Sequence, residues 1–291
     1  MLVALAAIWG SSFMFIKVAV RELAPGEVVF GRVLVGALAL LPAVPFTVGW
    51  RRLVAELRRF AWPLIILGIA NASVPFWLLA WSEKKLDSGL AGVLQASTPL
   101  FAAFVALGFS RSDRVTGARL VGVLIGFFGV VLLVGAQPRG DVLSALAVLG
   151  SAFCYAASAL YAGARLRGAS PIVTSFGSLS IATLTTLPLG VSQLPGNVPG
   201  WKVIGSVVAL GALGLSIAYL LYFGLIAGAG ASYAVLVTYL VPALALGYGA
   251  IFLDERVTAS AIGGLLLILA GVALGTGTLR LPRRAPAPET P

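Results

Sequence analysis

The sequence predicts an all-α integral membrane protein with ten transmembrane helices, arranged as two inverted five-helix repeats. Three observations lead to this fold class. Of the 291 residues, 59% are hydrophobic and 10% are charged, and the mean hydropathy is +1.03, whereas an ordinary soluble domain is about 25% charged. The apolar residues occur in runs of roughly 20, the length that crosses the hydrocarbon core of a bilayer. Finally, residues recur at fixed offsets between the two halves of the chain.

The apolar runs do not alternate with polar residues, which excludes transmembrane strands and favours helices. The first run lacks the basic start and cleavage site of a signal peptide, so we expect it to be retained. The expected helices cover residues 2–20, 27–48, 61–81, 89–109, 118–136, 142–164, 171–191, 203–225, 233–253 and 260–279. Between them lie charged, proline-rich or glycine-rich connections, which are 21–26, 50–59, 82–88, 110–117, 138–141, 165–170, 194–202, 228–230 and 254–258. Residues 280–291, rich in proline and arginine, are expected to form a disordered cytoplasmic tail.

An internal repeat organises these helices. Pro25, Phe30-Gly31 and Pro42 recur 146 residues later as Pro171, Phe176-Gly177 and Pro188. Arg114-Val115-Thr116, Gly122, Gly129-Val130 and Gly135 recur 142 residues later as Arg256-Val257-Thr258, Gly264, Gly271-Val272 and Gly277. Each half contains five spans, an odd number, so the second half must enter the membrane in the opposite orientation. We therefore expect one repeat over residues 1–139 and an inverted repeat over residues 140–279.

The charge distribution predicts the topology and excludes several functions. The net charge is +10, but the basic residues lie between apolar runs and form no nucleic-acid-binding face. With both termini in the cytoplasm, 12 basic residues fall in inside connections and 6 in outside ones, as the positive-inside rule requires. The chain has no histidine and one cysteine, Cys154, so we expect no metal, no cofactor and no enzyme activity. Two alternatives to a transporter are an integral-membrane enzyme and a passive channel. The enzyme would need acidic residues or histidines clustered at one membrane face.

Several motifs carry a family resemblance. These are Trp9-Gly10-Ser11-Ser12-Phe13 with Lys17, Pro25 and Arg32, Pro99, and then Pro242, Asp254-Glu255-Arg256-Val257-Thr258, Gly264 and Gly271. The pattern resembles the drug/metabolite transporter superfamily and, within it, the EamA-like ten-helix exporters. It departs from that pattern at Ser112-Asp113, where the family usually has Gly-Glu. The chain also looks like the YddG-type amino acid exporters. The resemblance implies a transporter in a bacterial-type inner membrane that exports small metabolites, with amino acids expected and other metabolites or drugs as the alternative.

Aromatic and polar residues on matching helices predict a central cavity. Trp9, Phe13 and Lys17 form one stripe, with Ser12 beside it. The repeat offsets relate Trp9 to Tyr155, Ser12 to Ser158 and Trp77 to Tyr219. The expected substrate-binding residues are Trp9, Ser12, Phe13, Lys17, Trp77, Gln95, Thr98, Tyr155, Ser158 and Tyr219. The alternative is that these aromatic residues pack in the bundle or at the membrane surface, and that the polar residues join helices.

Lys17 is expected either to bind a substrate carboxylate or to pair with Glu22, Glu27 or Glu83. All ten acidic residues fall in connections or at span ends, so we expect no carboxylate within the membrane for proton exchange. The expected mode of transport is therefore facilitated export or weakly coupled antiport. Pro99 and Pro242 are expected to be hinges for alternating access. Glycines spaced seven apart in the fifth and tenth spans are expected to pack within one chain, so a working monomer is expected rather than a dimer.

Overall fold

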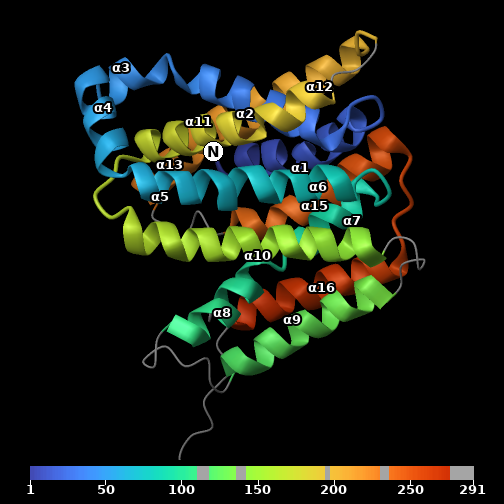
Figure 1. The fold of residues 1–291 in the computed structure, drawn as a ribbon. Helices are drawn as coiled ribbons and strands as arrows, with labels where there is room; N and C mark the ends of the chain where they lie inside the picture. Colours follow the sequence, from blue (N-terminus) through green and yellow to red (C-terminus); the bar gives the residue numbers. More distant parts are fainter. Residues whose placement is uncertain (110–117, 136–141, 194–196, 230–235, 276–291) are drawn as a thin grey trace, which may run out of the picture.

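A computed structural model describes residues 1–109, 118–135, 142–193, 197–229 and 236–275, and within these ranges the regular elements are all helices. The helices of the first half are α1 (Leu2–Ala19), α2 (Pro25–Leu40), α3 (Ala43–Thr47), α4 (Trp50–Arg59), α5 (Ala61–Gly68), the π-helix η1 (Ile69–Ser73), α6 (Val74–Ser82), α7 (Ser88–Gln95), α8 (Thr98–Phe109) and α9 (Ala118–Gly135). Those of the second half are α10 (Val142–Arg165), α11 (Pro171–Ser192), α12 (Trp201–Gly211), the π-helix η2 (Ala212–Ile217), α13 (Ala218–Ala229), α15 (Val237–Leu253) and α16 (Ala259–Gly275). Figure 1 shows the long helices side by side, with the short α3 and α4 at one end of the bundle.

Six helical stretches are long and apolar enough to cross a membrane, and three shorter apolar helices accompany them. The six are Leu2–Ala19, Ala61–Ser82, Ser88–Val105, Val142–Arg165, Pro171–Ser192 and Trp201–Tyr222. The shorter ones are Leu120–Val134, Val237–Leu253 and Ala259–Leu274. The expected all-helical, membrane-type fold is confirmed for the described residues. Ten spans and the inverted repeat stay predictions, and the expected tail lies outside the described residues.

The second expected helix is interrupted. The sequence predicts one helix over residues 27–48, but α2 ends at Leu40 and α3 follows separately. Pro42 explains the break, because proline has no N–H to donate to the preceding turn. Gly49 then takes the left-handed φ of 74°, and the chain turns into α4. Residues 50–59, expected as a connection, thus form an amphipathic helix that buries Leu53 and Glu56 and exposes its arginines.

Three other expected spans are also irregular. η1 interrupts the third span and η2 interrupts the eighth. π-Helical turns are rare in proteins, and those that do occur are often found at functional sites. In the fourth span, α7 ends at Gln95 and α8 begins at Thr98, with a turn just before Pro99. Pro242, by contrast, lies inside the continuous helix α15.

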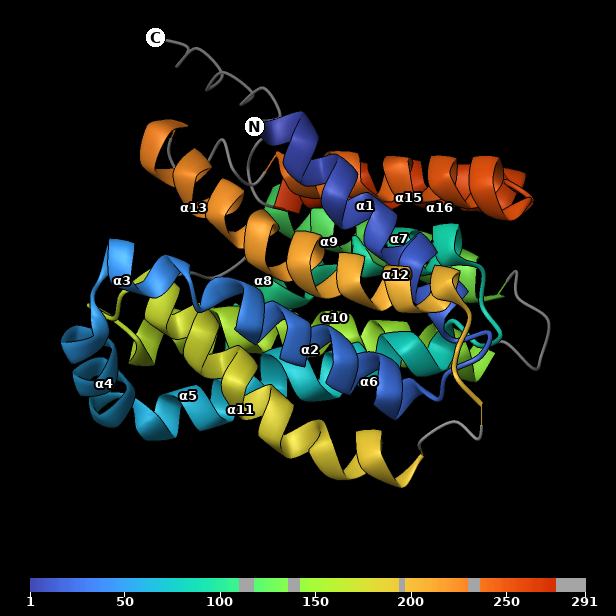
Figure 2. The same cartoon turned by 90° about the horizontal axis from the view of Figure 1, so that it is seen from above.

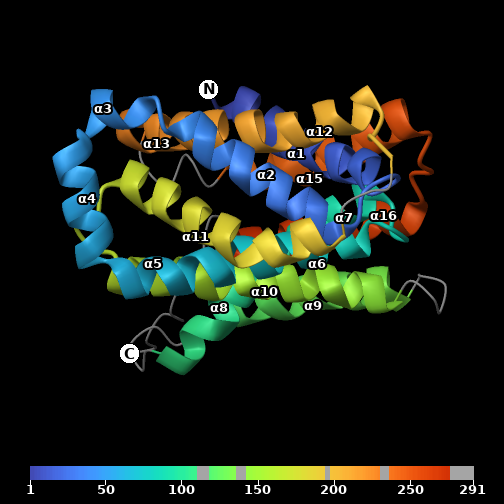
Figure 3. The same cartoon turned by 45° about the horizontal axis from the view of Figure 1, so that its top comes forward.

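The two halves pack on each other throughout. α2 lies against α11, α1 against α15 and α12, α10 against α6, and α7 against α15, an arrangement that can be followed in Figure 2. Figure 3 shows α4 between α3 and α5 at one end of the bundle. α9 and α16 lie side by side at the edge of the bundle in Figure 1. There Gly271 meets the backbone of Gly126, and Gly264 meets the side chain of Leu133. These contacts confirm that the expected glycines pack within the chain.

Candidate functional site

A buried arginine lies inside the bundle. Arg32, on α2, is only 5% exposed. Its Cζ lies 3.8 Å from the centroid of the Phe76 ring on α6, a cation–π contact. Its Nε has no hydrogen-bond partner among the described residues. Arg32 was not among the expected binding residues, because a long basic side chain in a span can also extend to the lipid headgroups.

Tyr155 and Tyr219, two of the expected binding residues, lie near this guanidinium. Both interact electrostatically with Arg32 and with each other. The ring of Tyr155, on α10, lies 6.2 Å from that of Phe76, centroid to centroid. Asn71, on η1, forms a hydrogen bond with Tyr219 on α13. Residues from both halves of the chain therefore gather around Arg32.

Trp9 and Ser12 lie against the second π-helix. Nε1 of Trp9 donates a hydrogen bond to the carbonyl oxygen of Gly214 in η2 at 3.2 Å, and its ring lies 5.6 Å from that of Tyr222. Ser12 Oγ donates to the Ile8 carbonyl at 3.1 Å. A Cβ at Gly214 would lie 3.2 Å from Ser12 Oγ, so the absence of a side chain at this position makes room for the hydroxyl.

Three expected residues contact near neighbours in the sequence, and a fourth is unpartnered. Trp77 stacks on Trp81, with ring centroids 6.3 Å apart. Gln95 Nε2 donates to Thr98 Oγ1 at 3.2 Å, and that hydroxyl donates to the Gln95 carbonyl at 2.8 Å. Ser158 is buried on α10, and its Oγ has no partner among the described residues. These contacts do not decide between a binding role and a packing role.

The other end of the α1 stripe is closed by packing. Phe13 is buried and lies against Gly92 of α7. The Lys17 ammonium donates hydrogen bonds to the carbonyl oxygens of Glu83 and Leu86, both at 2.8 Å. These carbonyls follow the last turn of α6, where a cation is electrostatically favourable. In this structure the Lys17 ammonium therefore caps α6 through these two bonds.

Glu83 is fully buried at this end of the bundle. Neither carboxylate oxygen has a hydrogen-bond partner among the described residues. Burial raises the pKa of the Glu83 carboxyl well above its ordinary value, and the charge of Lys17 acts in the opposite direction. Glu83 does follow a span end, as expected from the sequence, but position along the chain does not reveal burial. Glu83 is therefore a buried carboxyl group, so the expectation that no carboxylate is available for proton exchange does not apply to it.

A cavity of about 320 Å³ lies near the opposite end, where α3 and α4 are found. That volume is at the lower end of the range for small-molecule sites. Tyr219 lies in the wall of the cavity, and the other expected binding residues do not. The lining consists of Leu40, Thr47, Val48, Arg52, Ser170, Pro171, Ile172, Ser175, Tyr219 and Leu220.

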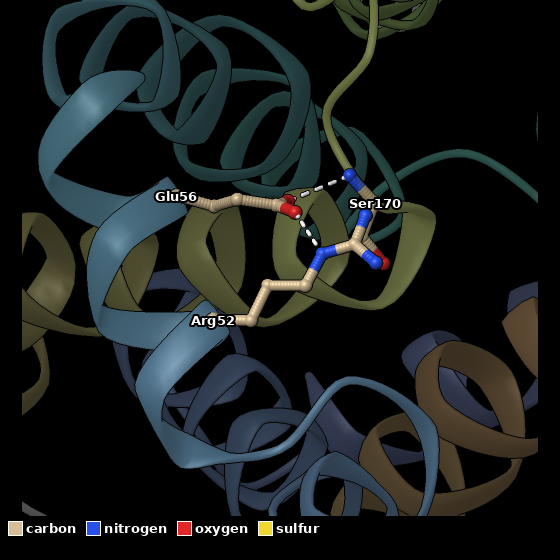
Figure 4. Close-up of polar contacts among 3 residues, drawn as sticks. All are labelled: Arg52, Glu56 and Ser170. Atoms are coloured by element: carbon tan, nitrogen blue, oxygen red, sulfur yellow. Dashed lines mark hydrogen bonds and ion pairs between the residues drawn. The ribbon is translucent and has the colours of Figure 1, made fainter.

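A carboxylate links the two halves at the edge of this cavity. Glu56 Oε1 accepts a hydrogen bond from Arg52 Nε at 2.6 Å, and Oε2 accepts one from the backbone N–H of Ser170 at 2.7 Å (Figure 4). Ser170 is the N-cap of α11, so the carboxylate satisfies a free N–H at the start of that helix. Burial opposes ionisation, but these two hydrogen bonds lower the pKa of Glu56 below its ordinary value.

Two further carboxylates cap helices at the end where Lys17 and Glu83 lie. Glu22 accepts from the backbone N–H of Gly200, the N-cap of α12, at 2.7 Å. Glu255 accepts from the backbone N–H groups of Ser88 and Gly89 at 2.8 and 3.0 Å, and from Ser88 Oγ at 2.9 Å, at the start of α7. Both join segments from different halves of the chain, so this end is held closed by polar contacts.

Comparison with known proteins identifies the family. The sequence profile of the EamA-like transporter family matches residues 1–135 and residues 142–276. The chain belongs to the EamA-like transporter family. This EamA-like transporter is therefore a multi-pass membrane protein that moves a small molecule, and its relatives are transporters, not enzymes.

Individual relatives are similar over nearly their full length. An uncharacterized transporter of Archaeoglobus fulgidus is 28% identical, over 91% of this chain and 93% of its own. The probable terminal-alkyne amino-acid exporter of Streptantibioticus cattleyicolor is 28% identical, over 91% and 89%. The probable amino-acid metabolite efflux pump of Escherichia coli is 25% identical, over 94% and 92%. A crystal structure with 18% identity superposes with a TM-score of 0.66 over 95% of both chains, which supports the fold alone.

Proposed function

We propose that this EamA-like transporter exports amino acids by alternating access around a central cavity. The observation that carries the proposal is the cavity itself, which lies between helices of both halves and has Tyr219 in its wall. Two relatives that align over about nine tenths of their length bear names that specify amino-acid export or efflux. The mostly apolar wall, with a few polar groups, suits a small molecule with an apolar side chain.

The proposal includes ten spans in two inverted repeats, over residues 1–139 and 140–279. Two features support it. The spans that the repeat equates make matching contacts. α1 packs on the eighth span (α12, η2 and α13) as α10 packs on the third span (α5, η1 and α6), and α1 packs on α15 as α10 packs on α7 and α8. The two π-helices also interrupt the third and the eighth span, which are equivalent in the repeat.

The proposed topology places both termini in the cytoplasm of a bacterial-type inner membrane. The excess of basic residues in the inside connections supports this orientation. The cavity then faces the cytoplasm, and the end that contains Lys17, Glu83 and Glu255 faces outward and is closed. The described conformation is thus an inward-facing one.

The ten expected residues, from Trp9 to Tyr219, remain the proposed substrate contacts. Tyr155 and Tyr219 have the strongest support, because both interact electrostatically with the buried Arg32. Pro99 and Pro242 are the proposed hinges. The break between α7 and α8 supports a hinge at Pro99, since proline leaves the preceding turn without one hydrogen bond. The contacts between α9 and α16 within one chain support a working monomer.

Counterflow in proteoliposomes tests the proposal. Vesicles loaded with an unlabelled amino acid should accumulate the labelled one transiently and saturably, and sugars and cationic drugs should compete poorly. Equal flux without counterflow would indicate a channel, and better competition by cationic drugs would indicate a drug exporter. The same assay with and without an imposed pH gradient separates facilitated export from proton coupling.

A further inference from the structure

Arg32 is a buried cation that forms no ion pair with a described residue. Among the described residues, no carboxylate oxygen lies within 4.0 Å of its guanidinium. Its described partner is the face of the Phe76 ring, and Nε makes no hydrogen bond to a described residue. A guanidinium keeps its proton at any physiological pH, so the charge cannot be removed by titration.

Such a charge is costly unless another group compensates for it. A cation–π contact offsets the lost hydration of a buried cation only in part. The hydroxyls of Tyr155 and Tyr219 interact electrostatically with the guanidinium, but a tyrosine hydroxyl is neutral at physiological pH. Glu83 also acts electrostatically on Arg32, but burial raises the pKa of its carboxyl and so favours the neutral form. Arg32 is therefore poised to bind a further anion.

The cavity gives an anion a route to Arg32. Tyr219 interacts electrostatically with the guanidinium and also lies in the cavity wall. A small molecule in the cavity that passes the Tyr219 side chain therefore comes close to Arg32. Leu40, Val48 and Ile172 form much of the remaining wall, and these side chains suit an apolar group on the same molecule.

We propose that Arg32 binds the carboxylate of the transported molecule, with the hydroxyls of Tyr155 and Tyr219 hydrogen-bonded to the same group. The planar fork of a guanidinium matches a carboxylate, and such paired, charge-assisted hydrogen bonds are among the strongest in proteins. This inference rests on the proposed function and gives that site its substrate class, monocarboxylates with an apolar body. It transfers to Arg32 the role considered for Lys17, whose ammonium is engaged by two carbonyl oxygens.

The test compares each carboxylate with its own amide in purified protein. The ligands are leucine, phenylalanine and 4-methylpentanoate, each with its corresponding amide. For each ligand, the melting temperature of the protein in detergent is measured as a function of ligand concentration. In wild type, each acid should raise the melting temperature at a concentration about tenfold or more below that of its amide. Arg32→Gln should lose this preference, Arg32→Lys should retain part of it, and Arg21→Gln, at an exposed arginine, should behave as wild type.

Stability without ligand separates binding from a purely structural role. Removal of an uncompensated buried charge should leave the melting temperature of ligand-free Arg32→Gln unchanged or higher. A marked fall in that temperature, in a variant that keeps the acid preference, would overturn the inference. So would a wild type that binds acids and amides equally. Counterflow is read separately, since an Arg32-dependent acid preference without amino-acid exchange would refute the proposed function and leave the inference standing.

Discussion

Replacing Gly271 with alanine tests the packing of α9 against α16. A Cβ at position 271 would lie 2.4 Å from the backbone nitrogen of Gly126 and 2.6 Å from the carbonyl oxygen of Gly122. Both are backbone atoms of the neighbouring helix, so no side-chain rotation can relieve the contact. Ordinary contact begins near 3.4 Å, and the two helices must therefore separate locally by about 1 Å.

The expected loss of stability follows from two opposing effects. Overpacking of a well-packed interface costs about 1–3 kcal/mol, and contacts with backbone atoms favour the upper part of that range. Alanine recovers up to about 1 kcal/mol through its higher helix propensity. The net destabilisation is about 1–2 kcal/mol, which corresponds to a fall in melting temperature of about 2–8 °C for a chain of this size.

Thermal unfolding in detergent measures this effect, and the same helix supplies the control. Gly263 has no atom within 4 Å of the position its Cβ would take, so Gly263→Ala changes helix propensity without a clash. This variant should melt at the wild-type temperature or slightly above it. If Gly271→Ala melts at the temperature of Gly263→Ala, the close approach of α9 and α16 is not present in the protein, and the reasoning fails.

Three further predictions concern transport and pH. Pro99→Ala should slow substrate exchange more than it weakens binding. The restored N–H hydrogen bond favours the straight helix by about 1 kcal/mol, which is about fivefold in the equilibrium between conformations. Unchanged flux with weaker binding would show that Pro99 is not a hinge. Trp77→Ala and Tyr155→Ala should each change the relative transport of leucine and alanine by about tenfold or more, and an unaltered ranking would place the cavity elsewhere. The lowered pKa of Glu56 means that its stabilising effect is present above its ordinary pKa of 4.5 and is lost as pH falls through the folded-state value. Melting curves of wild type and Glu56→Gln should therefore converge below about pH 4.5, and curves that stay parallel would exclude this role.

Hydropathy and residue size predicted most of the helices and the close packing of the glycines in α9 and α16, but not that these two helices pack on each other. Both depend on properties that each residue carries with it, since an apolar run of sufficient length must form a helix in a bilayer. Likewise, Gly264 and Gly271 can serve close packing wherever their helix meets another. Pro42 can break a helix, but it was considered only as a marker of the repeat. The end of α2 at Leu40 was therefore not predicted.

The direction of long side chains could not be predicted in the same way. Arg32 can reach either the headgroups or the bundle interior from one backbone position, and only the neighbours Phe76, Tyr155 and Tyr219 show which. Glu83 presents the same problem, because the connection that contains it is exposed or buried according to what packs over it. The π-helices are equally hidden, since one extra residue in a turn leaves the apolar pattern nearly unchanged.

Polar contacts join the two halves at both ends of the bundle, and their strength suits contacts that break and reform. Glu22 and Glu255 at one end, and Glu56 at the other, each accept backbone N–H groups at the start of a helix in the other half. Loss of such a cap costs about 0.5–2 kcal/mol, because water can take over the exposed N–H groups. Breaking two caps therefore costs about 1–4 kcal/mol, the range that keeps a minor conformation populated at about 0.1–10%. Apolar contacts alone would close the ends more uniformly, whereas these few polar caps give alternating access discrete contacts to break and reform.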